Sequence, residues 1–571
     1  MKLSPRNHRF NRIATGCLAV SLVIAAASAD TRSPKTDITR SIDIFTSVFK
    51  ELQTNYVDTI DAEKSVNTAI AAMLNDIDPY TEYYPASEQE DLAMMTSGEY
   101  GGIGAVITEI PGRGVYISEP YEGTPSQKAG LKAGDLIVAI DSDTVLTWHN
   151  SQVSARLKGE AGTPLTVTVK RPYNGPDSIL KFDLVRSKIQ LPSVPYYGML
   201  GDNTGYIFLS QFTDKSAADV RNALLELKKN PGMKSLILDL RGNPGGLLEA
   251  AVKIVSYFVP KNTEVIRTRG KGLLNEKVYK TTSSPIDTDL PLVVLIDGSS
   301  ASAAEITAGA LQDMDRAVII GSRSFGKGLV QGTRPIPYDG MFKVTTGKYY
   351  LPSGRLIQAI DYSHRNPDGS VARTPDSLTN EFATRHGRIV RDGGGITPDI
   401  KVEYPEINRL TYNIVSDHWA FDFATRYAAT HPTIPAPEQF DVTDTIFSEF
   451  KAFIDPTKFQ YDKVCEQMVQ NLRKVAESEG YMTDSTRHQL DILEGLLRHN
   501  LGHDLDNNRR DIDDILASEL VKRYYYQRGQ VAQSLRHDNA VDSASAVLSD
   551  PVRYKEILAP VKPDNDKKTK K

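Results

Sequence analysis

Cysteine is scarce in this chain: 571 residues contain only Cys17 and Cys465. Cys17 lies in an N-terminal segment that we expect to be removed, which would leave Cys465 alone. One cysteine can form no intramolecular disulfide, and it cannot build a cysteine-rich metal site.

The chain also lacks an excess of positive charge, with 67 Lys and Arg against 72 Asp and Glu. Proteins that bind nucleic acids usually carry a basic patch or stripe, so this balance argues against that class of partner. The one basic run is the tail "KPDNDKKTKK", which we interpret as a solvated, disordered end.

Long hydrophobic runs are missing as well. The most apolar stretch, "CLAVSLVIAAA" at residues 17–27, is too short to span a bilayer comfortably. It follows Lys2, Arg6, Arg9 and Arg12 and precedes Ala27-Ser28-Ala29, the pattern of an export signal cleaved after Ala29. We therefore predict a signal peptide at residues 1–29 and an exported, periplasmic protein. A retained inner-membrane anchor, or a lipoprotein modified at Cys17, are the alternatives.

Four regions with different sequence patterns follow the signal, as expected for a chain too long for one hydrophobic core. Helical periodicity covers residues 36–95, and short β-rich runs broken by glycine cover 98–185. Strands and helices alternate over 191–405, which predicts an α/β layer structure. Within it, the polar stretch "DYSHRNPDGSVARTPDSLTNEFATRHGRIVRDGGG" predicts a long insertion loop. Residues 406–571 are mainly helical and carry no motif tied to chemistry; a regulatory cap, an assembly surface and an adaptor-docking site all remain open.

The stretch "DGSSASAAEI", residues 297–306, places three serines between an apolar strand and a helix. A serine hydroxyl is a poor nucleophile until a neighbouring base takes its proton. The α/β segment has only two histidines, His364 and His386, both in the polar stretch, and the pattern G-x-S-x-G is missing. A Ser-His-Asp triad is therefore disfavoured, although distance in sequence does not exclude it.

Lysine is the alternative base, provided that it is neutral. Burial disfavours the charged form, and active sites can lower the pKa of a lysine to roughly 7–8. Lys327 stands between Gly326 and Gly328 in "SRSFGKGLVQ", directly after the apolar "RAVIIG". Taken alone, a lysine is usually a solvated surface residue, so its pairing with the serine segment carries the argument.

The β-rich segment resembles a PDZ domain of the kind found in bacterial proteases, through "EYGGIGAVITE", "GTPSQKAGLKAGDLIVAID" and "LKGEAGTPLTVTVKR". A PDZ domain adds a peptide as a strand and holds its terminal carboxylate on backbone amides. The residues expected to form this carboxylate-binding loop are Gly101, Gly102, Ile103 and Gly104, because small residues leave amides open to an anion. The alternative is a small β-barrel whose glycines serve only as turns. The implied partners are proteins or peptides with accessible C-terminal tails.

The stretch "SASAAEITAGALQDMDRAVIIGSRSFGKGLVQ" resembles the active-site region of the carboxy-terminal processing proteases, also called tail-specific proteases. The resemblance covers about residues 40–405 and includes "DLRGNPGGLL", "KYYLPSGRLIQ" and "GGGITPDI". It implies Ser302 as the nucleophile, Lys327 as the base and Gln331 as a residue that orients the lysine. The family often has serine at the position of Ala304, which is not the nucleophile.

The residues agree with this reading. Ser302 would lie where a strand ends and a helix begins, at the positive end of the helix dipole. Acyl transfer needs two donors for the oxyanion: Ala303 N–H is one candidate, and Gly245 or Gly246 of "RGNPGG" supplies the other, with the resemblance favouring Gly245. We interpret Glu305, Asp313 and Arg316 as mainly structural.

The resemblance implies a crotonase-like or ClpP-like α/β core that carries a PDZ domain, and a serine endopeptidase that needs no metal or organic cofactor; the signal peptide predicts that it is exported. Two rival hypotheses remain. An inactive binding protein could use the PDZ domain as a scaffold, although a matching serine, lysine and glutamine count against it. An acyl-CoA enzyme could use the oxyanion site alone, which fits an export signal poorly.

Overall fold

The computed structural model describes residues 34–560 except 174–177, 273–275, 367, 369 and 404–406. The predicted signal peptide, residues 1–29, and the basic tail lie outside the described residues. The chain divides into two compact units, residues 1–83 and 84–571, each of which is described by itself. No helix among the described residues is long and apolar enough to cross a membrane.

The first unit is helical, as the periodicity predicted. It contains α2 (Pro34–Asn55) and α3 (Ala62–Asn75). The side chain of Asp61 caps α3 by accepting a hydrogen bond from the Lys64 N–H at 3.0 Å.

The β-rich region forms a small antiparallel domain. Its sheet has the order β3-β4-β5-β7-β8, with β6 paired to β5, and its core contains Val115, Ile117, Ile137 and Val167. The elements are β3 (Ala105–Ile110), β4 (Gly114–Pro120), α5 (Pro125–Ala129), β5 (Leu136–Ile140), β6 (Asp143–Thr144), α6 (Asn150–Leu157), β7 (Pro164–Lys170) and β8 (Ile179–Val185). The start and the end of this domain are joined by a separate antiparallel pair of strands, β2 (Glu99–Gly102) and β9 (Ser187–Gln190).

The centre of the second unit is a six-stranded sheet of order β10-β11-β12-β15-β16-β23. Every pair from β11 onward is parallel, and β10 is antiparallel to β11. The strands are β10 (Tyr196–Leu200), β11 (Thr204–Phe208), β12 (Ser235–Asp239), β15 (Leu292–Ile296), β16 (Val318–Gly321) and β23 (Ile400–Lys401). The predicted α/β layers are therefore confirmed, and loops at the carboxyl ends of parallel strands can form a site.

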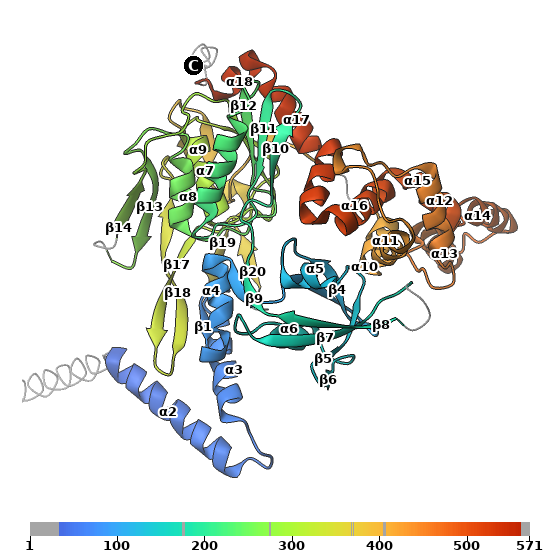
Figure 1. Ribbon diagram of the computed structural model, residues 1–571, viewed down its shortest axis with the longest axis horizontal. Coiled ribbons are helices and arrows are strands. Elements are labelled where there is room, and N and C mark those ends of the chain that lie inside the picture. Colours follow the sequence, from blue (N-terminus) through green and yellow to red (C-terminus); the bar gives the residue numbers. More distant parts are fainter. Residues whose placement is uncertain are drawn as a thin grey trace, which may run out of the picture. The chain divides into compact units, whose positions relative to one another are not determined.

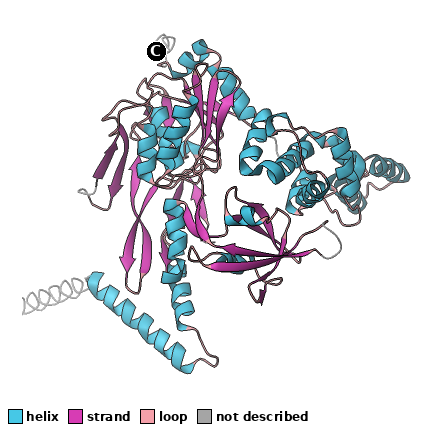
Figure 2. Ribbon diagram, in the orientation of Figure 1, coloured by secondary structure: helices cyan, strands magenta, loops and turns pink. Residues whose placement is uncertain are grey.

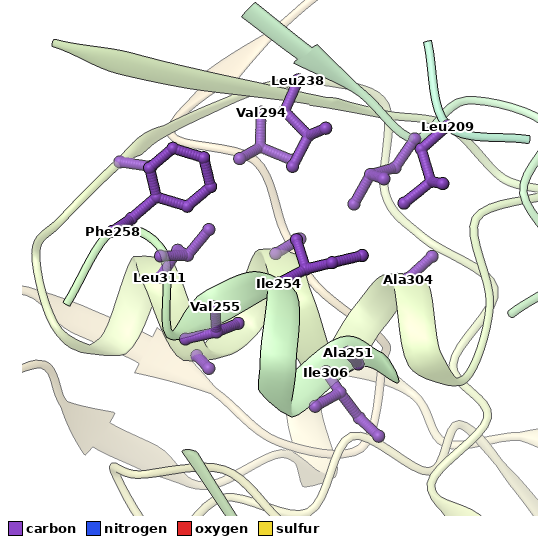
Figure 3. Packing of buried hydrophobic residues seen from close by; sticks show 14 of the residues in the cluster. Leu209, Leu238, Ala251, Ile254, Val255, Phe258, Val294, Ala304, Ile306 and Leu311 are labelled. Carbon is purple, nitrogen blue, oxygen red and sulfur yellow. The ribbon is translucent and has the colours of Figure 1, made fainter. Parts of the chain in front are cut away.

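Helices cover both faces of this sheet. Figure 1 shows α7 (Ser216–Leu227), α8 (Leu248–Val255) and α9 (Ala303–Asp313) on one side and α17 (Asn539–Leu548) on the other. On the first face, Ile254 of α8 and Ala304 of α9 pack under Leu238 and Val294 (Figure 3). On the second face, residues of α17 pack against the strands: Ala540, Val541, Ala544 and Val547. The end of the C-terminal region is thus a layer of the α/β core.

A second sheet joins β13 (Glu264–Gly270), β14 (Glu276–Lys280), β17 (Leu329–Ile336) and β18 (Gly340–Tyr350). The polar stretch after it is not the plain loop that the sequence predicted. It contains the hairpins β19 (Ile360–Arg365)–β20 (Val371–Arg373) and β21 (Glu381–Ala383)–β22 (Ile389–Arg391). Polar side chains anchor it: the buried Arg388 pairs with Asp315 and Asp399, both at 2.6 Å. An apolar pattern could not reveal such an arrangement.

The described chain after β23 is helical (Figure 2). It comprises α10 (Arg409–Ser416), α11 (Trp419–Thr430), α12 (Asp444–Phe453), α13 (Val464–Ser478), α14 (Asp484–Leu496), α15 (Leu501–Asn507), α16 (Arg509–Ser534), α17 and α18 (Pro551–Leu558). Helices α10 to α12 and α16 share a core around Phe423, Phe450 and Leu516. This helical region therefore has a hydrophobic core of its own besides the layer it adds to the sheet.

The packing of α17 can be tested with Val541→Asn, because Val541 is only 4% exposed against the sheet. Burial of an amide without partners costs about 1–3 kcal/mol. We expect a lower midpoint of thermal unfolding than in the wild type, whereas Val552→Asn, at a position 67% exposed, should leave it unchanged. Equal midpoints for both variants would contradict the layer assigned to α17.

Candidate active site

Ser302 occupies a strained turn between β15 and α9. Its φ and ψ are 53° and −112°, in a region that residues other than glycine rarely adopt. Such strain persists only where the surroundings impose it, and it is concentrated at functional sites. A sharp strand-to-helix turn that presents a serine is also the geometry of a nucleophile elbow, here formed without the glycine pattern that usually marks it.

The neighbouring serines have other tasks. Asp297 accepts hydrogen bonds from the N–H groups of Ser299 at 2.9 Å and Ser300 at 3.0 Å, which folds the start of the turn. The fully buried Ser300 donates its hydroxyl to the Leu240 carbonyl at 2.8 Å. Ser302 is the half-buried serine at the start of α9.

The glycine loop after β12 lies directly against this turn. A Cβ on Gly245 would stand 2.8 Å from the Ser302 Cβ and 2.9 Å from the Ala303 nitrogen, so only glycine fits. The Ala301 N–H donates to the Asn243 carbonyl at 2.9 Å and fixes the two segments side by side. A Cβ on Gly246 would instead strike the Phe212 carbonyl, at 2.0 Å. Of the two candidate glycines, Gly245 is therefore the one beside Ser302.

The two predicted oxyanion donors differ in their surroundings. Ala303 is the first residue of α9, and the first N–H groups of a helix have no partner within it. The Gly245 N–H donates to the Asn243 side-chain oxygen at 2.8 Å. Gly245 can therefore serve an oxyanion only if that hydrogen bond is exchanged.

Lys327 is half-buried in a loop after β16 whose glycines permit close packing. A Cβ on Gly326 would meet the Ala359 Cβ at 2.4 Å, and one on Gly328 would meet the Gln358 nitrogen at 2.7 Å. The glycines on both sides of Lys327 therefore allow this loop to pack closely against Gln358 and Ala359, and this packing fixes the position of Lys327.

Glu305 connects the serine turn to the lysine loop. One carboxylate oxygen, Oε2, accepts hydrogen bonds from the backbone N–H groups of both Ser302 and Lys327, each at 2.9 Å. The other oxygen accepts from the Ser324 hydroxyl at 2.5 Å and the Gly326 N–H at 2.7 Å. Four donors from two segments therefore converge on a single fully buried carboxylate.

Two effects oppose each other at Glu305. Burial raises the pKa of its carboxyl to about 7, while the four hydrogen bonds favour the charged form. Protonation would turn one acceptor into a donor and break part of this connection. From the sequence, Glu305 was interpreted as mainly structural; the spacing of Ser302 and Glu305, which matches a capping box, was the available signal for more.

Tyr349 forms a second connection that the sequence analysis did not identify. This buried residue of β18 directs its hydroxyl to the carbonyl of Lys327 and, at 3.3 Å, to that of Ser302. Gln331 lies nearby on β17, beside an irregularity in its pairing with β18, and donates to the Thr345 hydroxyl at 3.3 Å. Its predicted action on Lys327 stays a prediction.

The remaining candidates lie elsewhere. The exposed His364 pairs with Asp361 at 2.7 Å, and His386 contacts the Leu558 carbonyl at 2.9 Å. Among the described residues, neither histidine contacts Ser302. Asp313 forms a buried ion pair with Arg355 at 2.7 Å, which agrees with a packing role.

The predicted carboxylate-binding loop is split between a strand and a turn. Gly101 and Gly102 lie in β2, and Ile103 and Gly104 form the turn to β3. The Ile103 carbonyl accepts from the Ser126 N–H at 2.9 Å, at the start of α5. Since C=O and N–H of one peptide unit point in opposite directions, the Gly104 N–H points away from α5. Gly104 also lines a cavity of about 230 Å³ between β3 and α6.

Comparison with known proteins identifies the class. A model of peptidase family S41 matches residues 203–371, a PDZ model matches 116–171, and a model described as "Probable PDZ-protease, C-terminal helical domain" matches 410–548. The carboxy-terminal-processing protease of Bartonella bacilliformis is 36% identical over 346 residues, 60% of this chain and 78% of the relative. That of Picosynechococcus sp. is 36% identical over 303 residues, 52% of this chain and 70% of the relative. Among solved structures, a photosystem II D1 C-terminal processing protease aligns at 26% identity over 63% of this chain and 86% of its own, with a TM-score of 0.35.

A peptidase core joined to a PDZ domain defines a serine peptidase with its own peptide-binding module. The chain belongs to the carboxy-terminal processing proteases of peptidase family S41. The predicted family, the α/β fold class with a PDZ domain and the enzyme class are thereby confirmed.

The connection through Glu305 can be tested with Glu305→Gln. The amide NH₂ would face at least one of the N–H or O–H donors that now meet an oxygen, and each buried polar group left unpaired costs about 1–3 kcal/mol. We expect a lower midpoint of thermal unfolding and a large loss of peptidase activity. Glu249→Gln, at an exposed position on α8, is the matched control. Wild-type activity in Glu305→Gln would contradict the connecting role.

Proposed function

We propose that the protein is an exported endopeptidase in which Ser302 is the nucleophile and Lys327 the general base. The observation that carries the proposal is the shared Glu305 oxygen, which holds the backbone of both residues at 2.9 Å. The strained Ser302 backbone and the nearby Gly245 support the same assignment. The export signal at residues 1–29 lies outside the described residues and remains a prediction from its sequence pattern.

In the proposed reaction, neutral Lys327 takes the proton of the Ser302 hydroxyl as Oγ attacks the scissile carbonyl. Collapse of the tetrahedral intermediate breaks the C–N bond, and the lysine ammonium gives its proton to the leaving amine. Water then loses a proton to Lys327, attacks the acyl-enzyme and releases the new carboxylate, while Ser302 regains its proton. Gln331 is proposed to help orient the lysine.

The oxyanion is proposed to bind the N–H groups of Ala303 and Gly245. Preorganised donors at the developing charge are usually the largest single contribution to such catalysis. Ala303 N–H lies at the positive end of α9, which adds the favourable field of the helix dipole. Gly245 must first release Asn243, so the substrate or a movement of the loop has to exchange that hydrogen bond.

The PDZ domain is proposed to select the substrate tail. A peptide would add beside β3, and its carboxylate would meet the amides of the turn at Ile103 and Gly104. The walls of the cavity there are mostly apolar and include Ile103, Ala105, Ile107 and Leu157. Such walls favour a substrate whose C-terminal side chain is uncharged. Cleavage would occur upstream, where the chain reaches Ser302, so the substrates are proteins with free, apolar C-terminal tails.

The dyad predicts that Ser302→Ala and Lys327→Ala each lower kcat/KM by about 10⁴-fold or more, and that the double variant is little worse, because residues acting as a unit are non-additive. Lys327→Arg should be equally inactive, since guanidinium stays protonated.

Activity should rise with pH, because Lys327 must lose a proton and Glu305, with a pKa of about 7, must be ionised. Lys253→Ala, at an exposed position of α8, is the control. Substantial cleavage by either single variant, or a pH profile abolished by His364→Ala, would overturn the dyad.

Tail recognition predicts that amidation of a good peptide substrate lowers kcat/KM by about 10- to 100-fold, because hydrogen bonds to a charged group contribute about 1.5–3 kcal/mol. A terminal Asp-Asp should have a similar effect. Cleavage of casein, an unstructured protein, is measured in the same assay as the reference for peptidase activity. Equal cleavage of free-acid and amidated peptides across a range of concentrations would show that the PDZ domain does not read the tail.

A further inference from the structure

An ion pair joins the C-terminal helical domain to Arg241, the residue before the proposed oxyanion loop. Arg241 directly precedes the loop of Gly242 to Gly246, and its guanidinium binds Asp239 at the end of β12 at 2.6 Å. The same guanidinium binds Asp538 at 2.7 Å. The three side chains are 17%, 2% and 14% exposed, so water screens these charges weakly.

Asp538 uses its two oxygens differently. Oδ1 caps α17 by accepting the N–H groups of Ala540 at 2.9 Å and Val541 at 3.1 Å. Oδ2 binds Arg241. Because α17 is packed on the sheet, Asp538 is anchored from one side and can fix Arg241 from the other.

Arg241 in turn stands at the start of the loop whose later part approaches Ser302. The Gly242 N–H donates to Asp297 at 3.0 Å, and Asp297 also folds the serine turn. Three residues beyond Gly242, Gly245 lies against Ser302. A displacement of Arg241 would therefore move the loop that carries the proposed oxyanion donor.

The same helical domain also contacts the PDZ domain, through α16. Tyr526 interrupts this helix, with φ 54° and ψ −165°, a conformation that is strained for a bulky residue. Its hydroxyl accepts a hydrogen bond from the Gln127 side chain of α5 at 3.2 Å. The next N–H, that of Gln527, donates to Glu119 of β4 at 2.7 Å. The PDZ domain thus supplies partners at the interruption.

These PDZ contacts are adjacent to the carboxylate-binding turn. Ser126, the residue before Gln127, donates its N–H to the Ile103 carbonyl at 2.9 Å and its hydroxyl to the Gly104 carbonyl at 2.6 Å. Helix α5 therefore contacts the proposed tail-binding turn with one residue and α16 with the next. Beyond Tyr526, α16 ends at Ser534, and Asp538 follows after one turn of 3-10 helix.

We propose that the C-terminal helical domain positions the oxyanion loop, with Asp538 holding Arg241 and α16 linking this contact to the carboxylate-binding turn of the PDZ domain. The inference rests on the proposed function of Ser302 and Gly245. Asp538 is a positioning residue: it acts through Arg241 and does not touch the reacting atoms. A bound tail would act on catalysis by shifting α5 and, through Tyr526, the segment that ends at Asp538.

The first test is Asp538→Asn, which keeps an oxygen for capping α17 but removes the charge that holds Arg241; Asn and Asp cap helices equally well. We expect kcat to fall about tenfold with KM within twofold, which is less than the 10²–10³-fold cost of losing a whole oxyanion donor. The rate at which a fluorophosphonate labels Ser302 should fall in parallel, because its phosphoryl oxygen occupies the same site. The midpoint of thermal unfolding should fall only slightly, because Arg241 keeps Asp239 as its partner.

Asp542→Asn, an exposed position on the same helix, is the matched control. Asp538→Ser, which also keeps a cap and removes the charge, is the second variant if the first folds poorly. Asp538 variants indistinguishable from Asp542→Asn in kcat and labelling would overturn the inference. Labelling of wild type but not of Ser302→Ala in the same assay would show that the proposed function survives that result.

The link to the PDZ domain is tested with Tyr526→Phe, which removes the hydroxyl that binds Gln127. Tyr525→Phe is the control, since the Tyr525 hydroxyl donates to the Ile434 carbonyl inside the helical domain at 2.9 Å. We expect the kcat ratio between free-acid and amidated peptides to shrink at least threefold in Tyr526→Phe and to stay unchanged in Tyr525→Phe. An unchanged ratio in Tyr526→Phe would overturn the link through α16.

Discussion

The buried carboxylate of Glu305 is the constraint on which the candidate active site depends. Ser302 and Lys327 come from loops after different strands, and a backbone hydrogen bond from the Phe325 N–H to the Ser300 carbonyl, at 3.0 Å, also joins these loops. A single oxygen that accepts both backbone N–H groups sets their separation before any substrate arrives. Burial makes this arrangement sensitive, since a carboxylate in a dry site can lose its charge near pH 7, whereas the four donors retain it.

The glycines around the site have a steric purpose that complements this polar connection. Gly245 can approach Ser302 only because it lacks a Cβ, and Gly326 can lie against Ala359 for the same reason. Close approach brings backbone amides to where an oxyanion would form, and the cost is a loop with little intrinsic rigidity. Contacts from outside the loop, such as the ion pair of Arg241 with Asp538, supply the rigidity that the glycines cannot.

The sequence predicted the parts of this protein that rest on local patterns. Alternating apolar strands and helices gave the α/β layers, and "SASAAE" with "FGKG" located the serine and lysine segments. What it could not give depends on distant residues. Tyr349 lies far along the chain from Ser302, and the strained turn at Ser302 forms without its usual glycines. The hairpins of the polar stretch are anchored by ion pairs of Arg388 with Asp315 and Asp399. The periodicity of apolar residues in the sequence does not encode such ion pairs.

The C-terminal helices of this chain pack on the central sheet and also contact the PDZ domain. Helix α17, together with α18 and the end of α16, covers one face of the central sheet, so this part of the domain has a structural role. This packing places Asp538 at the edge of the sheet where β12 ends and the proposed oxyanion loop begins. Because α16 must cross from its own core to that edge, it passes the PDZ domain on the way, and Tyr526 lies where the two meet. A route from tail binding to catalysis then requires no further element, only that the strained residue in α16 have two arrangements of similar energy.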